Sequence, residues 1–104
     1  MTDRELLKLA AVSAGIEHVT PMMIEWGKWN PLTDDGDALR LAVALRMDIR
    51  IKTLPHVVYV EVFNGTAPSV IEPIADIRKQ ALDEFAATRR AIVRAAAEIG
   101  KAMP

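Results

Sequence analysis

Apolar and polar residues follow two different periods along this chain, and the change of period divides it into helices and strands. Over residues 3–14 the apolar positions recur at helical spacing. Thr2, followed three residues later by Glu5, forms the capping box that is typical of a helix start. We therefore predict an amphipathic helix over residues 3–14 that ends at Gly15.

The next two segments predict a strand and a second helix. Over residues 22–26 a period of two places Met22, Ile24 and Trp26 on one face and Glu25 on the other, which predicts a short strand. A second helix is predicted to begin at Thr33, because the Thr33 hydroxyl can accept hydrogen bonds from the first backbone amides of a helix. Three carboxylates follow where the helix dipole favours them: Asp34, Asp35 and Asp37. From residue 38 to 45 only Arg40 is polar, so we expect this helix to be buried between other elements.

The middle of the chain predicts a small sheet. Residues 47–52 alternate apolar side chains with three charged ones, which are Asp48, Arg50 and Lys52. A break at Leu54-Pro55-His56 separates them from residues 57–63, which are largely apolar on both faces and therefore predict the central strand. Asn64-Gly65 predicts a tight turn, and a short edge strand is expected within residues 68–73.

After Pro73 the pattern returns to helix, most strongly from Asp83 to Met103. Five apolar residues line one stripe of this helix: Phe85, Ile92, Ala96, Ile99 and Met103. Together these elements predict one α+β domain over residues 1–104, with a small, mainly antiparallel sheet of three or four strands and helices on both of its faces.

Composition narrows the classes of protein that the chain can belong to. The 104 residues are 51% hydrophobic and 26% charged with a net charge of -1, which is typical of a globular domain. A dedicated nucleic-acid binder of this size would carry a strong basic excess. Cysteine is absent, the first residues are acidic rather than signal-like, and no apolar run reaches the roughly 20 residues of a membrane span. We expect a cytoplasmic protein without membrane contact.

The acidic turn is the first candidate site. Asp34, Asp35 and Asp37 offer oxygen ligands at a spacing that superficially resembles the start of a calcium loop. The glutamate at the twelfth position of such a loop is missing, so capping and dipole complementarity are the preferred interpretation and no metal is predicted.

Arg89 is the second candidate, because it lies inside the apolar stripe of the last helix. A guanidinium that faces the core needs oxygen partners, since burying it unpaired costs several kcal/mol. We predict that Arg89 pairs with an acid of Asp34 to Asp37 or with the nearby backbone. The alternative is that its stem covers apolar surface while its head reaches solvent.

Catalytic signals are missing elsewhere. His18 and His56 belong to no metal-ligand or nucleophile arrangement, and there is no glycine-rich phosphate loop. Trp26 and Trp29 flank a turn and are interpreted as core or interface anchors. Basic residues offer a weak nucleic-acid surface: Arg46, Arg50, Lys52, Arg90 and Arg94.

Two blocks of the chain resemble the phage ABA sandwich domain family. They are residues 29–43, WNPLTDDGDALRLAV, and residues 87–100, ATRRAIVRAAAEIG. In the first block Trp29, Asn30 and Thr33 precede the acidic turn, and the second contains Arg89. The resemblance implies a small protein of a tailed phage or prophage with helices on both sides of a sheet. It implies no activity, so no catalytic residue or cofactor is carried over.

Three functions follow as hypotheses. The first is a non-catalytic phage accessory or interaction protein in the bacterial host cytoplasm, with an unknown protein partner and with self-association into a homo-oligomer. The second is a nucleic-acid-associated protein, which requires the basic residues to share one face. The third and weakest is an enzyme with a metal held by the three aspartates.

Overall fold

The computed structural model describes residues 2–15, 21–53, 57–63, 65, 69–76 and 84–103. Within them the chain forms four helices and a three-stranded antiparallel sheet, as the predicted α+β class requires. Several predicted features lie outside the described residues: His18, His56, the break at 54–56, Asn64 of the turn, and Asp83.

The first helix confirms its prediction and the second does not. Helix α1 spans Asp3–Ser13, and the Thr2 hydroxyl accepts from the Glu5 amide at 3.2 Å. Helix α2 spans Pro21–Glu25, where a strand over residues 22–26 was predicted. Proline favours the first position of a helix, because its missing N–H has no partner to lose there. The alternating pattern does not mark one buried face either, since Ile24 is buried whereas Met22 and Trp26 are exposed.

Three strands follow helix α3, which spans Asp35–Ala44. Strands β1 (Asp48–Thr53), β2 (Val57–Phe63) and β3 (Val70–Asp76) pair in that order, so β2 is central as predicted. The edge strand predicted within residues 68–73 is present and continues to Asp76. The helical pattern therefore does not begin directly after Pro73.

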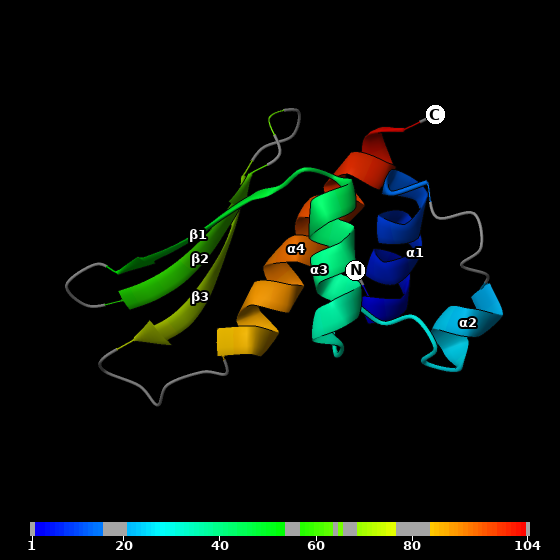
Figure 1. Ribbon diagram of the computed structural model, residues 1–104, viewed down its shortest axis with the longest axis horizontal. Helices are drawn as coiled ribbons and strands as arrows, with labels where there is room; N and C mark the ends of the chain where they lie inside the picture. The colour runs from blue at the N-terminus through cyan, green and yellow to red at the C-terminus, as the bar shows by residue number, and fades with distance from the viewer. Residues whose placement is uncertain are drawn as a thin grey trace.

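Helix α4, Glu84–Ala102, is the buried centre of the molecule. It lies between the sheet on one side and α1 and α3 on the other (Figure 1). Seven of its residues, most of them small, are buried: Ala91, Ile92, Val93, Ala95, Ala96, Ala97 and Gly100. The predicted stripe holds only in part, because Phe85 and Met103 are exposed.

Helix α3 was expected to be buried on all sides, and this prediction is wrong. Ala38, Leu41 and Ala42 face the core, but Leu39 and Val43 are 63% and 68% exposed. A helix that packs on a single neighbouring helix can bury only one of its faces. Here that neighbour is α4.

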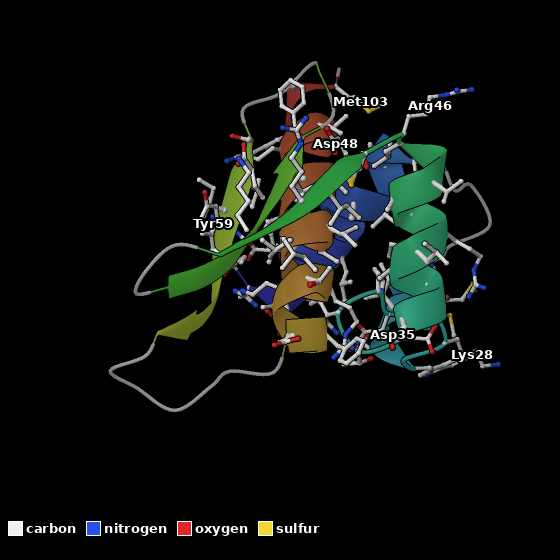
Figure 2. The ribbon with its side chains drawn as sticks, turned by 60° about the vertical axis from the view of Figure 1, so that its left-hand side comes forward. Lys28, Asp35, Arg46, Asp48, Tyr59 and Met103 are labelled. Carbon is white, nitrogen blue, oxygen red and sulfur yellow. The ribbon has the colours of Figure 1, made fainter. Side chains whose placement is uncertain are left out.

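The described helices all lie on one side of the sheet (Figure 1). Val60 and Val62 of β2 are fully buried on the side that α4 covers. Tyr59 points away from the helices on the opposite side (Figure 2). Within the described parts of the chain, the sheet therefore has helices on one face, and the predicted second covering layer is not found there. No helix among these residues is long and apolar enough to cross a membrane.

Candidate functional site: an acidic turn, an arginine and an apolar cleft

The acidic turn is held together by its own hydrogen bonds. The Asp34 carboxylate accepts from the Asp37 amide at 2.8 Å and thereby caps α3, so the cap is one residue later than the predicted Thr33. The Asp37 carboxylate in turn accepts from the Asn30 amide at 3.0 Å. Trp29 is buried in the core just before this turn, as its interpretation as an anchor requires. These bonds fix the entry of the chain into α3.

Arg89 of α4 reaches the same turn, as predicted. Its Nε donates to the Leu32 carbonyl oxygen at 2.8 Å, and its Nη1 donates to the Asp35 carboxylate. The Arg89 side chain is only 16% exposed, whereas that of Asp35 is 69% exposed. Because the carbonyl lies deeper, it is the partner that prevents Arg89 from being buried without a hydrogen bond. The pair therefore fastens α4 to the turn before α3.

The three aspartates do not share one partner, because Arg40 lies near Asp34 and Asp37, at 3.9 Å and 2.8 Å, whereas Asp35 pairs with Arg89. Asp34 is occupied by the cap and Asp35 by Arg89, while Asp37 is bound by the Asn30 amide and by Arg40 at 2.8 Å. In the described part of the chain, no group of three or more ligating side chains could hold a metal ion. In this geometry the three aspartates stabilise the start of α3 and its contact with α4.

The basic residues are divided between opposite faces of the sheet. Arg50 donates to Asp48 at 2.9 Å and Lys52 lies 3.1 Å from Glu61, all on the face away from α4. The hydrogen bond and the charge of Asp48 raise the pKa of Arg50 above its ordinary value. Each of these cations therefore already has an acidic neighbour.

Two other arginines of α4, Arg90 and Arg94, contact the opposite face of the sheet. Arg90 and Arg94 both approach Glu72, which is paired in register with the buried Val60 and so lies on the side that α4 covers. The nucleic-acid hypothesis required the basic residues to share one surface, and the described positions of these arginines and of Arg50 and Lys52 do not provide it. Arg46 is exposed at the bend before β1, with a φ of 53°.

An open apolar cleft of about 500 Å³ lies between α3, β1 and the start of α4. Its walls are mainly apolar side chains from these three elements: Ala38, Leu39, Ile49, Ile51, Phe85 and Ile92. Ile51 is 63% exposed although its register partner, Val60, is fully buried. The apolar face of β1 therefore extends beyond the area that α4 covers.

Family models, curated proteins and solved structures give no match to this chain. The resemblance to phage ABA sandwich domains accordingly stays a prediction. Among the described features, the cleft has the form of a binding site, since ligand pockets are concave, mostly apolar and of roughly 300–1,000 Å³.

The sequence did not reveal this cleft. Its signal was present in the run from residue 38 to 45, which holds more apolar positions than one helix face can bury. That excess was interpreted as burial on all sides. A helix with one buried face and one exposed apolar stripe has the same sequence pattern as a helix buried on all sides. The two cases differ only in which elements surround the helix.

Proposed function

We propose that this chain is a phage or prophage accessory protein that acts without catalysis, by binding protein chains that include copies of itself. The observation that carries the proposal is the open apolar cleft. Its exposed walls come from a helix, a strand and a second helix, and they include Leu39, Ile51 and Phe85. Monomeric soluble proteins rarely leave such surfaces contiguous and uncovered unless something binds there.

The chemistry of the surroundings favours a protein as the occupant. Two of the charged residues that line the cleft are used in contacts within the chain, because Arg89 donates to the Leu32 carbonyl oxygen and to the Asp35 carboxylate. A small ligand is usually oriented by a few polar groups that converge on it. An apolar protein surface needs no such groups, because water exclusion drives its association.

Self-association and capture experiments test this proposal. Light scattering over a range of concentrations should show the purified protein at more than its monomer mass of 11.4 kDa. Leu39→Lys should lower that mass, because it places a charge on the cleft wall without touching the buried residues of α3. Ile71→Lys is the matched control, since Ile71 is also exposed but lies on β3, at the other edge of the sheet.

The same three proteins can serve as baits in extracts of prophage-carrying bacteria. Partners that the wild type and Ile71→Lys retain, and that Leu39→Lys loses, would support binding through the cleft. A wild type that stays monomeric at the highest concentration, and retains nothing more than Leu39→Lys does, would refute the proposal.

A further inference from the structure

Strand β1 is an edge strand with one neighbour. Among the described elements it packs only against β2, and no other strand or helix lies along its outer edge. Its outward row of backbone amides and carbonyls therefore has no partner strand within the part of the chain that the structure describes. Such an edge is a template for pairing with another strand.

Helix α3 lies where it could pack against a strand added at the outer edge of β1. Leu39 lines the cleft together with Ile49 and Ile51 of β1, and Val43 follows one turn later on the same side of α3. Figure 2 shows β1 passing in front of α4, with α3 to the right of both. A strand added next to β1, about 4.8 Å away, would place its apolar side chains over this uncovered stripe of α3.

The sequence of β1 is complementary to itself. If two copies pair antiparallel with Ile49 opposite Ile49, each Asp48 lies opposite Arg50 of the second copy. Ile49 and Ile51 of each copy then lie on the same face of the joined sheet. The opposite charges meet on the face away from the helices, and the apolar residues meet over the cleft.

A neighbouring register is less favourable. With Arg50 opposite Arg50, two like charges would meet at the centre of the ladder. In the Ile49-centred register the remaining cationic pair would be Lys52 and Arg46. Arg46 lies before β1 and its φ of 53° is outside the extended range, so it does not continue the ladder.

We infer that two copies of this chain join along β1 in the Ile49-centred antiparallel register, which forms a six-stranded sheet and closes the apolar cleft of each copy. This inference rests on the proposed function and specifies how the self-association is made. The occupant of the cleft is thus the β1 strand of a second copy.

Charge exchange between two variants tests the register. Asp48→Arg places arginine opposite arginine in a dimer of that variant, and Arg50→Asp places aspartate opposite aspartate. Each variant alone should therefore run at 11.4 kDa in light scattering. An equimolar mixture should run at twice that mass, because each copy then meets the opposite charge. Both side chains are exposed and outside the core, so circular dichroism should show that each variant is folded.

Two further measurements separate this inference from the proposed function. Ile51→Lys should abolish the dimer, whereas the matched change Ile71→Lys on β3 should leave it intact. In the unmodified protein, hydrogen exchange of the β1 amides should slow as concentration rises. If the protein self-associates but the mixture gains no mass over the single variants and β1 exchange does not change, the β1 register is wrong and the proposed function survives. If the wild type is a monomer throughout, this inference fails, and the proposed function fails with it when the wild type also retains nothing more than Leu39→Lys does.

Discussion

Replacing Gly100 by alanine should destabilise the protein, although alanine is the better helix former. Gly100 lies where α4 crosses α1, and a Cβ atom built on it would stand 2.1 Å from the Leu9 carbonyl oxygen. That neighbour is backbone, so it cannot turn aside. The two helices would have to separate by about 1 Å, and a gap of that size forfeits up to about half of the dispersion energy of the affected contacts.

The magnitude follows from two opposing effects. Overpacking a tight core site typically costs about 1–3 kcal/mol, and the rigid neighbour places this site at the upper end. The gain in helix propensity returns at most about 1 kcal/mol. We therefore expect a net loss of about 2 kcal/mol in the free energy of unfolding, which lowers the Tm of a domain of this size by about 8–16 °C.

The matched control is the same substitution at Gly36. A Cβ atom there would meet only side-chain atoms, the end of Arg40 and the capping carboxylate of Asp34, both at 3.2 Å, so each would have to shift by only a few tenths of an ångström. Gly36→Ala should therefore be neutral or stabilising by up to about 1 kcal/mol. Urea and thermal unfolding followed by circular dichroism, at one fixed protein concentration, measure both variants. A Gly100→Ala protein as stable as the wild type would refute the close approach of α1 and α4.

Three further predictions concern the acidic turn. Arg89→Ala should lower the free energy of unfolding by about 2–3 kcal/mol, because it leaves the Leu32 carbonyl without its charged donor. Asp35→Ala removes only an exposed ion-pair partner and should lower the free energy of unfolding by less than about 1 kcal/mol. Equal effects of the two substitutions in urea unfolding would contradict this ranking. Asp34→Ala should lower the free energy of unfolding by about 1 kcal/mol, because α3 loses its N-cap. Thr33→Ala should lower it by less, and the reverse order in thermal unfolding would show that Thr33 is the capping residue. Millimolar calcium or magnesium should leave the Tm unchanged, because the three carboxylates point to separate donors; a rise in Tm that Asp34→Ala abolishes would restore the metal hypothesis.

The local parts of the fold could be predicted because they depend on neighbours in sequence. The capping box at Thr2 and the alternation in β1 and β2 are patterns of this kind, and both appear in the structure. The pairing of Arg89 was also accessible, since a cation within an apolar stripe must find an oxygen partner wherever the chain provides one.

The errors arose where the outcome depends on distant contacts. Five residues are enough for either a strand or a helical turn, and the position of Pro21 at the helix start decided between them at α2. The apolar run of α3 was expected to be packed between other elements, but it is α4 that lies between the sheet and two other helices. The cleft could not be predicted because it is defined by the spacing between three elements.

The pairing of α1 with α4 has a consequence for how the chain folds as it is made. Residues 3–13 leave the ribosome well before residues 84–102, yet they bury their apolar face against them. Until then Leu6 and Leu7 lack the surface that covers them, so the nascent chain exposes the apolar face of α1 until α4 has been synthesised. The core cannot form before α1 meets α4, and contacts of such long sequence separation are typical of domains that fold more slowly.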